Sequence, residues 1–177
     1  MATVPSEVTV TAGTVLPAAT WNTNVRDAIN FVIAPPLCLL RQTVAQSVGN
    51  NSFTALTMDT EDIDRDGGHS TVTNTSRYTA QTAGYYLHSG LVGWSGNATG
   101  RRASRWAVNG TAANSTDVIN AATSASAIDV SPAARIIYLN VGDYSELFAF
   151  QDSGGNLNTA VATGSDQPGS SILWVST

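Results

Sequence analysis

The spacing of apolar residues changes at a double proline, Pro35–Pro36, and the change divides the chain into a helical segment and a β-rich segment. Proline disfavours helical geometry in the residue before it and lacks an N–H group, so a helix is expected to end there. Upstream, apolar residues recur with the spacing of an amphipathic helix: Trp21, Val25, Ala28, Ile29, Val32 and Ile33. We predict one short helix here, with Thr20 or Asn22 as its N-cap.

From Leu37 onward the spacing changes to the two-residue period of β-strands. The clearest strand lies in residues 84–96, where one face would consist of Tyr86, His88, Gly90, Val92 and Trp94. Asn109–Gly110 is a strong hairpin signal, and Gly142–Asp143 is expected to form a second turn. Other expected strands lie in residues 37–44, 52–58, 70–81, 101–108, 134–141, 145–151 and 170–177, with a loop at 59–70 and a long connection, containing a weak strand, at 111–131. Many short strands between turn signals are typical of an all-β sandwich or jelly roll.

Composition argues against several classes of partner. Charged residues make up 12% of the chain, against roughly a quarter in typical globular proteins, and the formal net charge is −5. Nucleic-acid binding requires clustered cations, and the cluster at Arg101, Arg102 and Arg105 lies in an acidic chain. We therefore predict no nucleic-acid partner and expect these arginines to form surface or interchain ion pairs. The sequence has no secretory signal and no apolar run long enough to span a membrane, so we predict no membrane partner.

Several strands are apolar on both faces. In residues 84–94, one face would carry Tyr86, Val92 and Trp94, and the other face would carry Tyr85, Leu87 and Leu91. In residues 145–151, Phe148 and Phe150 lie on the face opposite to that of Leu147 and Ala149. A sandwich buries only one face of each sheet. Each large apolar side chain contributes roughly 1.5–3 kcal/mol when it is buried, so the second face favours association with other chains. A closed ring of three copies is one solution.

The order of the motifs resembles that of complement globular heads and the tumour-necrosis-factor superfamily. The matching motifs are the strand start Gly84-Tyr85-Tyr86, the turn Asn109-Gly110, the turn Leu139-Asn140-Val141-Gly142-Asp143 and a closing apolar strand. The resemblance covers roughly Leu39 to Thr177 and implies an all-β, TNF-like jelly roll. The chain departs from the family pattern at His88, where an aromatic residue is usual, and at Ser145, where an apolar residue is usual.

Residues 18–36, together with the following strand and an Asp-x-Asp-Gly-Gly-His-Ser loop, resemble virion proteins of tailed bacteriophages that infect actinobacteria. This resemblance implies a homotrimeric structural protein, made in the host cytoplasm and displayed on the phage particle as a capsid decoration, head fibre or minor tail protein. We predict that it is not an enzyme. An alternative is a host-recognition adhesin that binds cell-surface glycan.

We divide the chain into an extended arm with an anchoring helix, residues 1–36, and a jelly-roll trimerisation domain, residues 37–177. An isolated helix of about a dozen residues is only marginally stable, so its apolar stripe needs a partner surface. We predict that the stripe docks on the major capsid or tail protein through Trp21, Val25, Ile29, Val32 and Ile33. The alternative is that the helix folds back as a lid over its own sandwich.

The acidic stretch Asp62, Asp64, Asp66 has the spacing of the first half of a calcium-binding loop. The twelfth position is Thr73, where an EF-hand has a bidentate glutamate, so the stretch is not an EF-hand. We keep a Ca²⁺ or Mg²⁺ site as one hypothesis and predict no other cofactor. The alternative is an acidic turn whose carboxylates accept backbone N–H groups.

Other chemically suggestive residues have simpler structural interpretations. His69, beside Ser70 and Asp66, lacks the motif of a nucleophile elbow, and a hydrogen-bonded core or interface position is expected for His88. Asp143 and Glu146 have the chemistry of a glycosidase pair, although a turn explains Asp143. A sugar-stacking surface for the adhesin alternative would use Trp94, Trp106, Tyr144 and Trp174.

Overall fold

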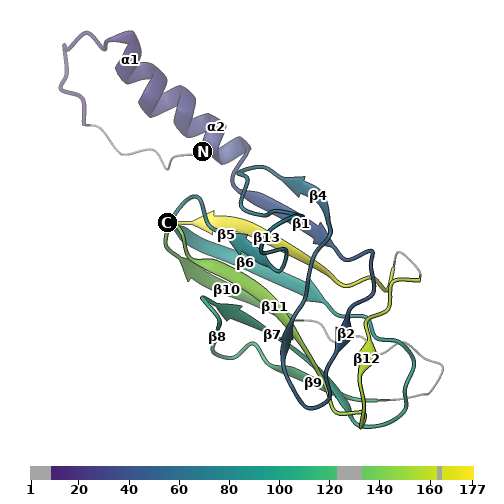
Figure 1. Cartoon of the computed structure of the whole chain (residues 1–177). Coiled ribbons are helices and arrows are strands. Elements are labelled where there is room, and N and C mark those ends of the chain that lie inside the picture. Colours follow the sequence, from purple (N-terminus) through teal and green to yellow (C-terminus); the bar gives the residue numbers. More distant parts are fainter. Residues whose placement is uncertain (1–8, 123–132, 163–164) are drawn as a thin grey trace.

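Two β-sheets pack face to face, and a helical segment projects from one end of the sandwich (Figure 1). This computed structural model describes residues 9–122, 133–162 and 165–177. The all-β sandwich with a preceding short helix confirms the predicted fold class.

The helical segment begins at Ala18 and contains three parts in succession: α1 (Ala18–Trp21), the π-helical η1 (Asn22–Arg26) and α2 (Asp27–Ile33). The N-cap is Pro17, so the prediction of Thr20 or Asn22 was wrong. The Pro17 carbonyl accepts the Trp21 N–H at 3.1 Å, and a residue at this position needs no N–H of its own, which makes proline compatible with a helix start. The helix ends before the double proline, as predicted.

The first sheet has the antiparallel order β10-β6-β13-β1-β4. Its strands are β10 (Ala133–Leu139), β6 (Gly84–Leu91), β13 (Gly169–Ser176), β1 (Leu37–Arg41) and β4 (Thr60–Asp64). The prediction of a loop over residues 59–70 was therefore wrong for β4. Acidic residues are depleted in strands, but β4 is an edge strand, where charged side chains reach water.

The second sheet has the order β3-β11-β7-β8, with β5 paired to β11 and β9 paired to β7. Its strands are β3 (Thr54–Ala55), β11 (Tyr144–Gln151), β7 (Arg101–Val108), β8 (Thr111–Ala112), β5 (Arg77–Thr79) and β9 (Val118–Ala121). The short strands β2 (Ser47–Val48) and β12 (Leu157–Asn158) pair beside the sandwich. Positive φ angles at Asn109 and Gly110 form the predicted turn between β7 and β8. Residues 123–131 of the predicted connection lie outside the described residues.

The core fills the space between the two sheets. The predicted inward face of residues 84–94 is confirmed, because all of its members are buried: Tyr86, His88, Gly90, Val92 and Trp94. Trp106 on β7 and Tyr78 on β5 supply large side chains from the opposite sheet.

His88 and Ser145, the two departures from the family pattern, meet in this core. His88 Nδ1 lies 3.1 Å from the Tyr86 carbonyl and therefore carries the proton it donates there, while Nε2 lies 3.0 Å from Ser145 Oγ. The serine hydroxyl can then donate to Nε2, which satisfies both side chains in the neutral state of the histidine. Burial lowers the pKa of His88 to about 4. The second departure thus compensates the first, and it links β6 to β11 across the sandwich.

Candidate interaction surfaces

The outer face of the first sheet carries large apolar side chains with no covering element among the described residues. Tyr85 on β6 and Tyr138 on β10 are cross-strand partners whose ring centroids lie 5.1 Å apart. Leu87 and Ile136 form the next pair along the same strands. We call this surface the bare face and define it by the exposed residues Tyr85, Leu87, Ile136, Tyr138 and Val175.

The strand register extends the apolar surface across the sheet. Leu87 pairs with Leu173 on β13, and Leu173 pairs with Leu37 on β1, so one apolar row crosses four strands from Ile136 to Leu37. In the next row Ser89 and Ser171 replace the leucines. These small side chains leave a hollow of about 410 Å³.

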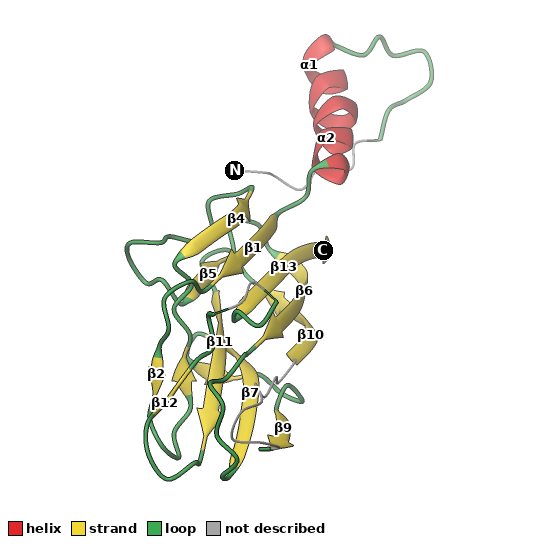
Figure 2. Ribbon diagram, turned by 90° about the vertical axis from the view of Figure 1, so that its right-hand side faces the viewer, coloured by secondary structure: helices red, strands yellow, loops and turns green. Residues whose placement is uncertain are grey.

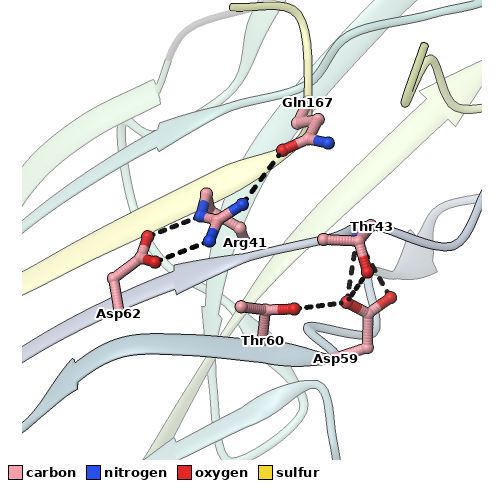
Figure 3. Close-up of polar contacts among 6 residues, drawn as sticks. All are labelled: Arg41, Thr43, Asp59, Thr60, Asp62 and Gln167. Carbon is pink, nitrogen blue, oxygen red and sulfur yellow. Dashed lines mark hydrogen bonds and ion pairs between the residues drawn. The ribbon is translucent and has the colours of Figure 1, made fainter. Parts of the chain in front are cut away.

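An ion pair forms one rim of this hollow (Figure 3). Arg41 on β1 donates from Nε and Nη2 to the two carboxylate oxygens of Asp62 on β4, at 2.6 and 2.7 Å, and from Nη1 to Gln167 at 3.3 Å. The hydrogen bond and charge of Arg41 lower the pKa of Asp62. Both side chains are solvent-exposed, so the pair fixes local geometry more than it stabilises the fold.

A second carboxylate in Figure 3 fastens the loop that follows β1. Asp59 accepts the Thr43 N–H at 2.8 Å, the Thr43 hydroxyl at 2.7 Å and the Thr60 hydroxyl at 3.0 Å. Burial opposes ionisation of Asp59, but the hydrogen bonds outweigh it and lower the pKa.

The two outward phenylalanines of the second sheet are covered by side chains of the same chain. Phe148 and Phe150 on β11 point outward there. The Arg105 guanidinium lies 3.6 Å from the Phe53 ring centroid and 5.9 Å from that of Phe148. The Phe53 ring in turn lies 5.0 Å from Phe150. These contacts leave both outward phenylalanines only half-exposed.

The helix contacts the sandwich through the aromatic side chain of Phe31. Phe31 is buried and meets Trp174 edge to face, with 4.7 Å between ring centroids, and the Pro36 carbonyl accepts the Trp174 N–H at 3.0 Å. The rest of the helix stands away from the β-domain (Figures 1 and 2), so it is not a lid over its own sandwich. We define the helix stripe as Trp21, Val25, Ile29, Val32 and Ile33. The exposed fraction of the side chain is 55% for Trp21, 51% for Ile29, 76% for Val32 and 72% for Ile33.

The acidic stretch does not assemble a ligand set. Asp62 pairs with Arg41, and Asp66 accepts the Tyr78 hydroxyl at 2.8 Å. Asp64 accepts the backbone N–H groups of Gly67, Gly68 and His69 at 3.0–3.1 Å. Among the described residues no group of three or more His, Cys, Asp or Glu side chains is placed to hold a metal ion. The geometry matches the acidic-turn alternative.

The other suggestive residues are held by structural contacts. Both ring nitrogens of His69 lie beside backbone carbonyl oxygens, of Arg77 at 2.7 Å and Met58 at 3.0 Å, and neither lies beside a nucleophile. Asp143 accepts the side-chain amide of Asn109 at 2.7 Å, whereas Glu146 accepts the Ser76 hydroxyl at 2.7 Å. The structure therefore brings together neither the triad nor the carboxylate pair.

The aromatic residues of the sugar-stacking alternative are also held by structural contacts, in agreement with their simpler structural interpretation. Trp94 and Trp106 lie fully in the core, Trp174 packs against Phe31, and the Tyr144 ring is covered by the Arg77 guanidinium at 4.0 Å. Aromatic residues at inward strand positions fill the core instead of forming a platform.

The three clustered arginines have different environments. Arg101 forms the expected surface ion pair with Asp152 at 2.8 Å, whereas Arg105 stacks on Phe53. Arg102 is fully buried and donates to the carbonyls of Asn97, Thr99 and Arg101. In the described part of the chain, no helix has the length and apolar character needed to cross a membrane.

No protein-family model matches the chain, and no curated protein matches it significantly. Several solved structures are similar to it. The globular domain of zebrafish complement 1qA protein aligns with a TM-score of 0.58 at 12% identity, covering 79% of this chain and 97% of that domain. Murine APRIL aligns with a TM-score of 0.58 at 13% identity, covering 78% of this chain and 98% of that structure. At these identities the comparison shows the fold, a complement-head and TNF-like jelly roll.

Proposed function

We propose that the chain is a structural subunit of a tailed-phage virion, in which three copies associate through the bare face and residues 1–36 hold the trimer on the particle. The bare face carries this proposal. Its members are 40–54% exposed, and burial of a large apolar side chain contributes roughly 1.5–3 kcal/mol. A contiguous apolar patch of this kind on a folded domain indicates an interaction site.

Three observations support a ring of three copies on a particle. A closed ring covers the same patch on every copy and leaves no open end. The ordered motifs of residues 39–177 resemble those of families for which trimers are expected, and the solved structures share the fold. The front segment resembles phage virion proteins, and its helix holds an apolar stripe outside the β-domain.

Two measurements test the proposal separately. Light scattering on the purified full chain is expected to give three times the chain mass at micromolar concentration. Deletion of residues 1–36 is expected to leave a trimer that no longer joins particles. A mass of one or two chains contradicts the trimer, and recovery of the truncated protein on purified virions at normal copy number contradicts the tether.

A further inference from the structure

The π-helical part of the helix aligns four members of the helix stripe. In a regular α-helix, residues four apart drift by about 40° around the axis at each step. Trp21, Val25, Ile29 and Ile33 follow this four-residue spacing, so in a regular helix they would spread around the axis. The segment η1 closes with an i→i+5 hydrogen bond from the Asp27 N–H to the Asn22 carbonyl, and this wider turn opposes the drift. The result is a narrow apolar line along one side of the helix.

This line faces away from the chain's own sandwich. In α2, Ile29 and Ile33 each lie two residues from Phe31, which places them on roughly the opposite side of the helix at about 100° per residue. Phe31 faces Trp174, whose side chain points to the interior side of the first sheet. The apolar line therefore points away from the sandwich interior, as the bare face does.

The bare face and the helix lie at the same end of the first sheet. Val175 follows Trp174, the residue that Phe31 contacts. Tyr85 follows Gly84, where a side chain would collide with the Trp174 ring. Figure 2 shows the helix beyond this end of the first sheet, on the side away from the second sheet. An association through the bare face therefore brings the helices of neighbouring copies close together.

The polar surface of the helix does not oppose such an arrangement. The charged residues between Ala18 and Ile33 are Arg26 and Asp27, which pair with each other at 2.9 Å. Three such helices side by side carry no net charge, so no like-charge repulsion separates them.

We propose that the apolar line of each helix packs against the same line of the other two copies. The trimer then has a parallel three-helix stem above its jelly rolls. This inference rests on the proposed trimer and replaces the expectation that the stripe docks directly on another protein. The β-domains hold the three helices at an effective concentration in the millimolar range, which offsets the marginal stability of a short helix. The stem, as a unit, then carries the arms that attach the trimer to the particle.

Cysteine cross-linking of the full chain tests the stem. Ile29→Cys places a thiol on the aligned stripe, and Asn30→Cys places one on an exposed flank as the matched control. The native Cys38 is buried, and burial raises its pKa, so it stays unreactive under mild oxidation. We expect Ile29→Cys to form disulfide-linked pairs of chains in a fraction that is unchanged on tenfold dilution, and Asn30→Cys to remain uncross-linked.

The outcomes separate the stem from the proposed function. A trimeric mass with an Ile29→Cys thiol that reacts freely with a maleimide and forms no disulfide overturns the stem and leaves the trimer intact. Equal cross-linking of both variants overturns it too, because it shows no preferred helix face. A monomeric mass for the unmodified chain overturns both proposals. Repeating the experiment with Ile33→Cys, one turn closer to the β-domain, must give the same result as Ile29→Cys.

Discussion

The two sheets of the sandwich both point large apolar side chains outward, but they differ in what covers them. On the second sheet, Arg105 and Phe53 lie over Phe148 and Phe150. On the first sheet the bare face has no such cover among the described residues. The outward phenylalanines of one sheet are therefore covered within the chain, whereas the apolar side chains of the other stay exposed.

This difference shows why strands that are apolar on both faces do not by themselves identify an interface. Phe148 and Leu87 belong to the same kind of strand in the sequence, and both alternate with buried residues. Their surroundings differ because the β7 neighbour of Phe148 is Arg105, whereas the neighbours of Leu87 are Ile136 and Leu173. Cross-strand neighbours decide which apolar face stays exposed.

The largest expected effect comes from a charge on the bare face. Ile136→Asp places a carboxylate where the proposed interface excludes water, and the cost of desolvating it is expected to weaken assembly at least about 100-fold, or roughly 3 kcal/mol. Light scattering across a dilution series measures the change. Ile119→Asp is the matched control, because Ile119 is 57% exposed on β9 of the second sheet and Ile136 is 54% exposed. Equal weakening by both variants would show that the two outer faces do not differ.

A second expected effect concerns the contact that joins the sheets through His88 and Ser145. Burial lowers the pKa of His88 from 6.5 to about 4, so the unfolded chain binds a proton in this range that the folded chain does not. The free energy of unfolding is therefore expected to keep its full value, as far as His88 determines it, above pH 6.5. It is expected to fall by about 3 kcal/mol as the pH drops to 4. Carboxylates with lowered pKa, such as Asp59 and Asp143, lose their contribution only below their ordinary value of 3.8.

Urea unfolding at several pH values measures this slope. The variant His88→Gln is expected to be less stable at pH 7 and to lose the dependence between pH 6.5 and 4. A wild-type free energy of unfolding that is constant over this range would contradict the neutral buried histidine.

Much of the fold follows from local patterns, because period-two alternation and the Asn109–Gly110 turn act over a few residues. The strand β4 escaped prediction because its acidic residues read as a loop, and its pairing with β1 is a long-range property. The contact of Phe31 with Trp174 was also missed. The sequence signals this contact only by placing an aromatic residue, Phe31, on the side of the helix opposite the stripe. No local pattern identifies Trp174 as its partner.

Candidate sites were less predictable than the fold. The spacing of Asp62, Asp64 and Asp66 suggested a common ligand. The register shift that leaves Asp62 unpaired in β4, and the turn after the strand, instead direct each carboxylate to a different protein partner. The aromatic residues of the sugar-stacking alternative include Trp94 and Trp106, whose inward positions place them in the core, as aromatic residues at strand positions usually are. The helix stripe depends on one local period, and the structure leaves four of its five members exposed, although what covers them stays a proposal.

Removing the cover of the second sheet is expected to make its outer face resemble that of the first. Phe53→Ala removes the ring between Arg105 and Phe150. Because the ring is half-buried, the loss is expected to be about 2 kcal/mol, below the 3–5 kcal/mol of a core phenylalanine. Urea unfolding measures the cost, and Val72→Ala, at a site that is 84% exposed, is the control. No difference between the two variants would mean that Phe53 does not act as a cover.

The smallest expected effect lies at the rim of the first sheet. Asp62→Asn breaks the exposed pair with Arg41 and is expected to leave Tm and assembly nearly unchanged, because exposed ion pairs contribute little. Asp64→Asn should lower Tm more, since Asp64 fastens three backbone N–H groups of the following turn. Because the protein's own donors already bind these carboxylates, neither millimolar calcium nor a chelator is expected to shift Tm. Weaker assembly in Asp62→Asn would extend the proposed interface to this rim. A calcium-dependent rise in Tm would support the metal hypothesis.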